Sequence, residues 1–136
     1  MRSQVPSKKA LSAADSTLGT VRFLDRLVEN GEEPQLGAQI ISPRRGYLHH
    51  GIYIGNGRVV HYAGLAYGLF RGPVEETSLA QFARGQSVWM RWRRHAAFDR
   101  TEIVLRALSR VGEDRYQILH NNCEHFCEWC IHGEPR

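Results

Sequence analysis

Long hydrophobic runs are missing from this chain of 136 residues. No apolar stretch approaches the roughly 18 residues that a membrane-spanning helix needs, so the sequence predicts no such helix. Residues 1–16 carry basic side chains but lack the apolar block that follows such residues in a secretory signal. We therefore expect a protein that stays in the cytoplasm.

Cysteine is also scarce, and its placement is uneven. The chain has three cysteines, which all lie in one short stretch: Cys123, Cys127 and Cys130. An odd number of cysteines in a chain without an export signal argues against a disulfide framework. The thiols are therefore expected to be buried or to take part in chemistry.

The rest of the composition is that of a globular protein, with 42% hydrophobic, 10% aromatic and 24% charged residues. At this length we expect one domain over residues 18–136, preceded by a polar, mobile leader at residues 1–17. The formal net charge of +4 suits a phosphate, nucleic-acid or anionic-lipid surface. Many ordinary proteins carry such an excess, so the charge alone identifies no partner.

The patterning predicts an α+β fold in which helices pack on a small antiparallel sheet. Its clearest signal is Asn56-Gly57 between two β-branched runs, because both central residues of a type I′ hairpin turn need positive φ. Strands are expected at residues 39–41, 47–54, 58–62 and 88–93, with a long loop at 63–74. Helices are expected over residues 21–28, 78–85 and 99–112, and in a last segment that Asn121 or Asn122 caps. The apolar stripe expected on the third helix comprises Ile103, Leu105, Ala107, Leu108 and Val111.

The predicted hairpin carries two histidines twelve residues apart. Side chains alternate along a strand, so His49 and Gly51 share one face while His50 and Ile52 share the other. If Gly55 pairs with Arg58, His61 faces Ile52, and His49 approaches His61 only through a bend or bulge. Gly51 would leave room there for another element. Histidines that merely decorate a sheet remain the alternative interpretation.

Cys123 falls in the first turn of the last predicted helix. The free N–H groups and the positive dipole end at a helix start favour the thiolate, the nucleophilic form of cysteine. Cys127 and Cys130 follow further down the same stripe and are expected to be buried core thiols. A cysteine at a helix start with histidines on a strand elsewhere is typical of thiol-dependent acyl transfer. The backbone N–H of Cys123 is then a candidate oxyanion donor.

Metal binding is the competing interpretation of the three cysteines. Their C-x3-C-x2-C spacing is one that iron–sulfur enzymes use, and a zinc site that adds nearby histidines is conceivable. On a continuous helix, however, the three positions span about 10 Å at ~1.5 Å per residue, which is too long for one tetrahedral ion. We therefore expect no metal and no cofactor.

Two blocks of the sequence together resemble the lecithin:retinol acyltransferase family. They are the stretch from His49 to His61, which reads HHGIYIGNGRVVH, and Asn122-Cys123-Glu124-His125-Phe126. The similarity covers about residues 36–133. It implies a circularly permuted relative of the NlpC-type and papain-like cysteine hydrolases, in which the histidines precede the cysteine.

The same resemblance implies roles for single residues. Cys123 would be the nucleophile, His49 its base, and His61 the residue that orients and polarises His49. Asn122, Glu124 and His125 would support the motif, Glu124 by complementing the helix N-terminus and His125 by bonding the backbone. The implied reaction is a two-step acyl transfer or hydrolysis through a thioester. Its substrate would be an ester or an amide, and phospholipid is one candidate. An NlpC-type peptidase or amidase is the alternative, and no nucleic-acid partner is expected.

A further pattern concerns residues 88–94, which combine tryptophan and arginine. If Val88 and Met90 face the core, then Trp89, Arg91 and Arg93 point outward, and Arg44, Arg45 and Arg84 add to the cationic surface. Indole and guanidinium groups together suit weak peripheral contact with anionic lipid headgroups. A solvated face is the alternative interpretation.

Overall fold

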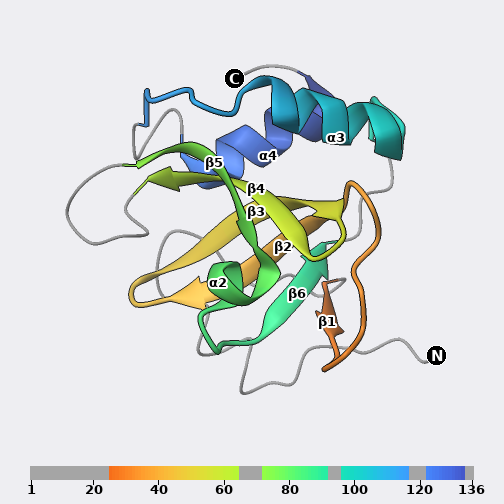
Figure 1. Ribbon diagram of the computed structural model, residues 1–136, viewed down its shortest axis with the longest axis vertical. Coiled ribbons are helices and arrows are strands. Elements are labelled where there is room, and N and C mark those ends of the chain that lie inside the picture. Colours follow the sequence, from red (N-terminus) through yellow and green to blue (C-terminus); the bar gives the residue numbers. More distant parts are fainter. Residues whose placement is uncertain (1–24, 65–71, 92–95, 117–121, 134–136) are drawn as a thin grey trace.

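The structure, a computed structural model, describes residues 25–64, 72–91, 96–116 and 122–133 (Figure 1). The leader expected at residues 1–17 lies outside these ranges. The described residues form helices and an antiparallel sheet in a single small α+β domain. The expected fold class is therefore confirmed at this level.

The sheet has six antiparallel strands in the order β1-β6-β2-β3-β4-β5 (Figure 1). The strands are β1 (Arg26–Val28), β2 (Gln39–Arg44), β3 (Tyr47–Gly55), β4 (Arg58–Gly64), β5 (Gly72–Ser78) and β6 (Val88–Arg91).

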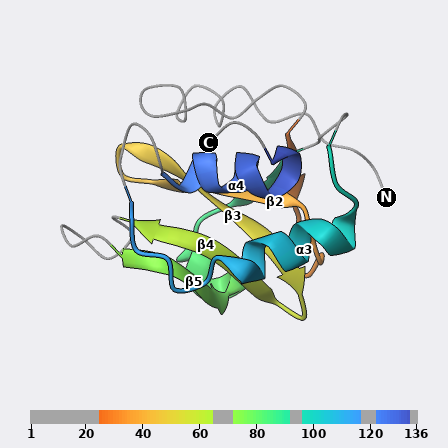
Figure 2. The same cartoon turned by 90° about the horizontal axis from the view of Figure 1, so that it is seen from above.

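Helices cover both faces of this sheet. They are α2 (Leu79–Ala83), α3 (Arg100–Ser109) and α4 (Cys123–His132). Helices α3 and α4 pack on one face, against Ile52 and Val60, while Phe82 of α2 packs on the opposite face against Tyr53 and Val59. Figure 2 shows α3 and α4 lying together above the sheet. Because both faces are covered, β3 and β4 are buried along most of their length.

The Asn56-Gly57 hairpin forms as predicted, and both of its turn residues have positive φ. Its register differs from the expected one by a bulge. Gly55 pairs with Arg58, but Tyr53 pairs with Val59 and Ile52 with Val60. The bulge therefore moves His61 away from Ile52 and toward Gly51, which is the irregularity that the approach of His49 to His61 requires.

Two expected elements near the sheet edges are wrong. The helix predicted up to Val28 is a strand at Arg26–Val28, because this segment pairs with β6 and packs Leu27 against Trp89. The loop predicted up to residue 74 gives way to β5 at Gly72. A short strand next to turn residues carries too little periodicity to be distinguished from a helix or a loop.

The apolar stripe predicted on α3 is only partly buried. Ile103 and Ala107, which are four residues apart and share one helix face, are buried against α4. Leu105 and Leu108 are 55% and 38% exposed, and Val111, beyond the helix, is also exposed. The helix thus contacts the core along a narrower line than its apolar content suggested.

The outward orientation expected for Trp89 and Arg91 is wrong. The two side chains are only 4% exposed each. Trp89 pairs with Ile41 and Arg91 with Gln39, and cross-strand partners point to the same face, which here is the face that α4 covers. Residues 92–94 lie outside the described ranges. Of the helices in the described part of the chain, none combines the length and hydropathy needed to cross a bilayer.

Candidate active site

His49 and His61 meet on the α2 side of the sheet. His49 Nε2 lies 2.6 Å from His61 Nδ1, and both side chains are almost fully buried. A Cβ on Gly51, between them, would lie 2.7 Å from Val59 Cγ1 and 2.9 Å from the Phe82 ring. The glycine therefore does leave room for another element, and that element is α2, whose Phe82 packs against the His49 ring.

Glu75 on β5 extends this pair into a chain of three groups. It stands opposite His61 in the β4–β5 register, and its Oε2 lies 3.0 Å from His61 Nε2. The sequence interpretation missed Glu75 because it placed the start of β5 in a loop. A strand prediction there would have exposed the signal, since the alternation of Val74, Glu75 and Glu76 aims one carboxylate at the histidine.

The carboxylate also assigns the tautomers of both rings. A carboxylate only accepts hydrogen bonds, so His61 Nε2–H donates to Glu75. Neutral His61 then accepts at Nδ1 from His49 Nε2–H. This leaves the lone pair of His49 on Nδ1, a buried atom that has no hydrogen-bond partner among the described residues. The hydrogen-bonded series Glu75–His61–His49 therefore ends on His49 Nδ1, a basic nitrogen without a hydrogen-bond partner among the described residues.

The imidazoles of His49 and His61 are both held in the neutral form that this series of hydrogen bonds requires. Burial lowers the pKa of His49 well below 6.5, and the neighbouring His61 and Arg44 charges lower it further. Burial also lowers the pKa of His61, against the opposing effect of its hydrogen bond to Glu75. At neutral pH His49 is therefore unprotonated and can accept a proton.

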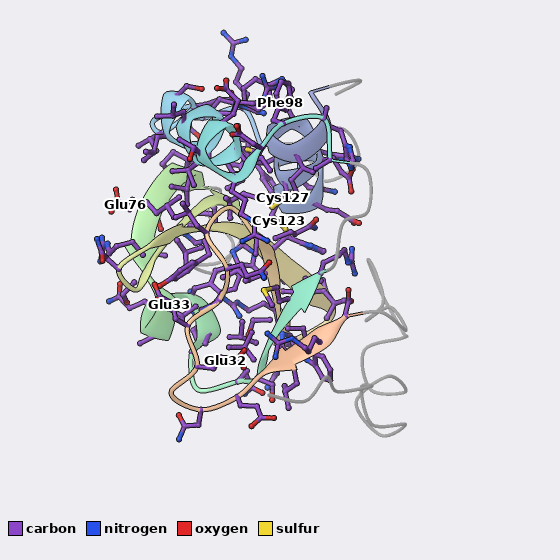
Figure 3. All side chains as sticks on the ribbon, turned by 90° about the vertical axis from the view of Figure 1, so that its right-hand side faces the viewer. Glu32, Glu33, Glu76, Phe98, Cys123 and Cys127 are labelled. Carbon is purple, nitrogen blue, oxygen red and sulfur yellow. The ribbon has the colours of Figure 1, made fainter. Side chains whose placement is uncertain are left out.

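Cys123 is the first residue of α4, and Asn122 caps the helix. The Asn122 side chain accepts a hydrogen bond from the His125 N–H at 3.0 Å, and His125 Nδ1 accepts one from the Asn122 N–H at 3.3 Å. The structure thus places Asn122 at the cap and His125 on the backbone, as expected. Cys123 and Cys127 both lie between α4 and the sheet, while Glu32, Glu33 and Glu76 lie at the periphery (Figure 3).

The thiol of Cys123 reaches the edge of β3. Its Sγ lies 4.0 Å from the Leu48 carbonyl oxygen, and the His50 N–H also bonds to the sulfur. The backbone N–H and C=O of Tyr53 bond to residues 37 and 38, on the β2 side of β3. In an antiparallel strand these groups point to opposite sides at successive residues, so those of the even-numbered Leu48 and His50 point toward β4. The paired part of β3 and β4 stops at Ile52, and the thiol occupies the edge beyond it.

Cys123 therefore contacts the main chain on both sides of His49. The His49 ring itself lies on the α2 face, whereas α4 covers the other face. Among the described residues, no hydrogen bond joins Cys123 Sγ to the His49 ring. The proposed nucleophile and base are thus neighbours through the backbone of one strand.

The expected depression of the Cys123 pKa is not found. Burial raises the pKa of this thiol to about 11, and the Glu124 charge adds to the increase. The N–H groups of His50, Cys123 and Glu124 do lower the pKa, as predicted for a helix start, but desolvation outweighs them. At neutral pH the resting site therefore pairs a neutral thiol with a neutral imidazole.

Cys127 and Cys130 are buried core residues, in agreement with the sequence interpretation. Burial raises the pKa of Cys130 to about 12. Within the described ranges, no group of three cysteine, histidine or carboxylate side chains is arranged so that it could hold a metal ion.

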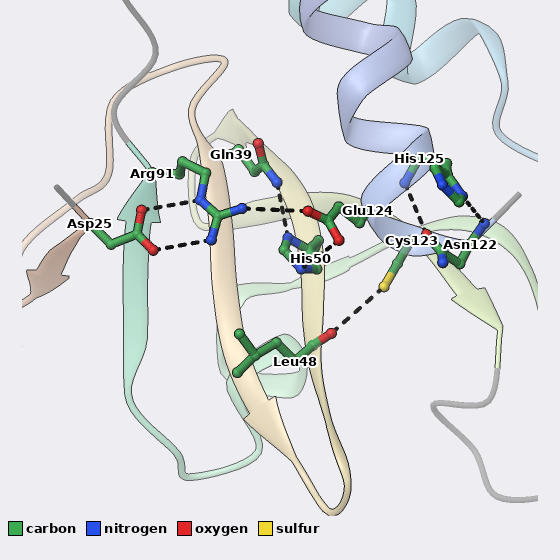
Figure 4. A network of polar contacts seen from close by, with 9 residues as sticks. All are labelled: Asp25, Gln39, Leu48, His50, Arg91, Asn122, Cys123, Glu124 and His125. Atoms are coloured by element: carbon green, nitrogen blue, oxygen red, sulfur yellow. Dashed lines mark hydrogen bonds and ion pairs between the residues drawn. The ribbon is translucent and has the colours of Figure 1, made fainter. Parts of the chain in front are cut away.

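Glu124 contributes more than a charge in the first turn of α4. Its carboxylate lies 3.6 Å from Arg91 Nη1 and 4.0 Å from His50 Nε2 (Figure 4). Arg91 in turn forms a buried ion pair with Asp25. Sequence reasoning missed Asp25 and assigned Arg91 to the surface, because no local pattern links residues so far apart in the chain.

Comparison with known proteins gives consistent relatives. Residues 32–136 match the family profile described as lecithin retinol acyltransferase. The chain is 32% identical to human phospholipase A and acyltransferase 2 over 119 residues, which cover 76% of this chain and 74% of that protein. It is 28% identical to bovine lecithin retinol acyltransferase over 120 residues, which cover 68% of this chain and 52% of that protein.

Proposed function

Because the chain belongs to the lecithin retinol acyltransferase family, we propose that it is an acyltransferase or acyl hydrolase that uses Cys123 as its nucleophile. The observation that carries this proposal is the chain Glu75–His61–His49, which ends on a buried imidazole nitrogen without a partner. That nitrogen belongs to the residue whose flanking peptide groups contact the thiol. A base and a nucleophile are thereby brought to one strand.

In the first step His49 Nδ1 takes the proton of the Cys123 thiol as the sulfur attacks the substrate carbonyl. The backbone N–H of Cys123, at the start of α4, donates to the oxyanion. When the carbon–oxygen or carbon–nitrogen bond of the substrate breaks, protonated His49 gives its proton to the leaving alcohol or amine. Water, an alcohol or an amine then attacks the thioester, and His49 acts again as base.

His61 and Glu75 hold His49 in the tautomer that this reaction needs. The Glu75 carboxylate also stabilises the positive charge that spreads over the two imidazoles after proton transfer. The resting histidine is uncharged, so the proton transfer must accompany the attack. We propose on this basis that the site has no stable thiolate–imidazolium pair before substrate binds.

The names of the relatives support a lipid acyl donor, phospholipid first, for this chain as well. The finer proposals are a permuted papain-like architecture, action in the cytoplasm and weak peripheral contact with membranes. Arg91 is not part of the membrane-contact surface, because its side chain is buried and forms an ion pair with Asp25.

The test is intact mass spectrometry after incubation with phosphatidylcholine vesicles and acid quench. We expect one added acyl chain, mapped to Cys123, and no adduct in Cys123→Ala. Cys127→Ala is the matched control, since it removes a thiol of the same helix and should keep the adduct. An adduct on Cys127 or Cys130 would overturn the assignment, and acylation by a panel of peptide amides instead of phospholipid would favour a peptidase or amidase.

The base is tested in the same assay. His49→Gln should slow adduct formation by about 10²–10⁴-fold, the usual contribution of general-base catalysis. His132→Gln, a histidine change near the other end of α4, should leave the rate unchanged. Equal rates for the His49 variant and the wild type would remove His49 from the mechanism.

A further inference from the structure

A line of polar and charged groups crosses the α4 face of the sheet beside Cys123. It runs from Asp25, just before β1, through Arg91 on β6, Glu124 on α4 and His50 on β3 to Gln39 on β2 (Figure 4). Four of these side chains are almost fully buried, and Glu124 is the only one of the five with substantial exposure. The mechanism proposed above uses none of them.

Arg91 is held rigidly at one end of this line. Its Nε and Nη2 donate to the two carboxylate oxygens of Asp25, both at 3.1 Å. Arg91 and Asp25 are 4% and 1% exposed. A buried ion pair is weak evidence for stability, because desolvation offsets its attraction. Its two-point geometry does fix the direction of the remaining guanidinium nitrogen, Nη1, which points at Glu124.

His50 supports Glu124 from the other side. The Gln39 Nε2 amide donates to His50 Nδ1 at 2.9 Å, so a neutral His50 carries its proton on Nε2. That nitrogen lies 4.0 Å from Glu124 Oε1. The Glu124 carboxylate is thus placed between a fixed cation on β6 and a histidine on β3.

These contacts matter for the neighbouring thiol. Glu124 follows Cys123 directly, and the N–H of His50 bonds to the Cys123 sulfur. The negative charge of Glu124 disfavours the Cys123 thiolate. Arg91, which pairs with Glu124, partly cancels that charge and so weakens this effect. Among the described ionisable groups, Glu124 on α4 and Tyr47 on β3 interact electrostatically with the thiol. Arg91 on β6 and His50 on β3 face the Glu124 carboxylate. His49 lies on β3 between the two residues whose main chain contacts the sulfur.

We propose that Arg91 and Glu124 are positioning residues for Cys123. Arg91, held by Asp25, ties the first turn of α4 to β6 and balances the Glu124 charge beside the thiol. This inference rests on the proposed role of Cys123 as nucleophile. It adds a device that sets both the place and the ionisation of that nucleophile.

The test measures the rate of iodoacetamide alkylation at Cys123 between pH 7 and 9, by peptide mapping. In this range the rate follows the thiolate fraction, so a pKa change of one unit alters it tenfold. Glu124→Gln removes the negative neighbour and should raise the rate about 3- to 10-fold at each pH. Arg91→Gln leaves that charge unbalanced and should lower the rate by a similar factor.

The double variant Arg91→Gln with Glu124→Gln separates charge balance from folding. With Glu124 neutral, the loss of Arg91 should change the rate less than twofold relative to Glu124→Gln alone. Arg91→Lys should recover most of the wild-type rate. Because Arg91→Gln strands a buried carboxylate, Asp25→Asn combined with Arg91→Gln provides a second version, with circular dichroism as the check of folding.

Arg58→Gln is the matched control, because Arg58 forms a solvent-exposed ion pair with Glu76 away from the site. It should leave the alkylation rate unchanged. The proposal is wrong if Arg91→Gln slows alkylation equally with and without Glu124, or if Glu124→Gln leaves the rate unchanged. Alkylation of Cys123 needs no acyl transfer. The absence of an acyl adduct in the wild type would therefore contradict the proposed function, but it would not change the alkylation rates that test the roles of Arg91 and Glu124.

Discussion

At the scale of single residues, the protonation of two groups determines how the site can work. Burial keeps the His49 imidazole neutral and also keeps the Cys123 thiol protonated. The same burial that removes the thiolate from the resting enzyme leaves His49 Nδ1 with a free lone pair. In the proposed mechanism the nucleophile is thus created only when the proton moves from the thiol to His49.

The cysteines should therefore react in a defined order, but only slowly at neutral pH. Alkylation should reach Cys123 before Cys130, because the pKa of Cys123 is about 11 against about 12 for Cys130 and only Cys123 has any exposure. The rate should keep rising toward alkaline pH. Peptide mapping after timed iodoacetamide treatment at pH 6 to 9 measures both. A rate plateau below pH 7 would mean that a thiolate already exists at rest.

Gly51 should tolerate no side chain, because the two histidines and α2 close over it. A Cβ there would meet Val59 and Phe82 at under 3 Å and His61 Cβ at 3.3 Å. We expect Gly51→Ala to lower the free energy of unfolding by about 1–3 kcal/mol, as overpacking in a core does. Urea denaturation measures it. Combination with Phe82→Leu should recover part of the loss, and strictly additive effects of the two changes would contradict the contact.

At the scale of elements, the start of α4 is the part that organises the site. Its cap, its first thiol and its first carboxylate each contact a different partner: Asn122 bonds the helix backbone, Cys123 the edge of β3, and Glu124 the arginine on β6. A small shift of this turn would alter all three contacts at once. The first turn of α4 should therefore be more sensitive to change than the rest of the helix.

Two helix caps provide a matched comparison of this sensitivity. Asn122 caps α4, and Asp99 caps α3 through a hydrogen bond to the Glu102 N–H. Replacement of either residue by alanine should cost about 1 kcal/mol of unfolding free energy. Only Asn122→Ala should also reduce acyl transfer, about tenfold or more, because only its helix carries the proposed nucleophile. Equal activity in the two variants, measured as kcat/KM, would show that the cap does not position Cys123.

The elements that could be predicted from the sequence share a strong local signal. The hairpin follows from Asn56-Gly57 and the caps from Ser78, Asp99 and Asn122. The predictions for segments without turn or capping residues were wrong. Arg26–Val28 is a strand because β6 pairs with it, and β5 begins inside a predicted loop. Tertiary pairing, which no short window contains, determines both.

At the scale of the whole molecule, the same limit applies to the site. The spacing of His49, His61 and Cys123 is a local property of two motifs and could be recognised from the sequence. Glu75, Arg91 and Asp25 join the site only through the order of the strands. Burial on both faces of the sheet also explains two wrong expectations. Arg91 was expected at the surface but is buried, and the pKa of Cys123 was expected to be lowered but is raised.

Burial of two neutral histidines makes the stability of the molecule depend on pH. In the unfolded chain a histidine binds a proton near pH 6.5, whereas the pKa values of His49 and His61 are lower in the folded protein. Below about pH 6.5 the unfolded state therefore binds more protons, and acid favours it. The stabilisation is fully present above pH 6.5 and is lost as the pH falls, by up to about 1.4 kcal/mol per pH unit for each histidine.

Urea denaturation at pH 5.0 to 7.5 should accordingly show a free energy of unfolding that falls steadily below pH 6.5. The lowered pKa of Glu32, beside Arg26, acts only below its usual value of 4.5, so it does not contribute in this range. His49→Gln combined with His61→Gln should flatten the dependence, whereas His132→Gln, on a half-buried position of α4, should keep it. An unchanged slope in the double variant would mean that these two histidines are not the buried neutral pair on which the proposed mechanism depends.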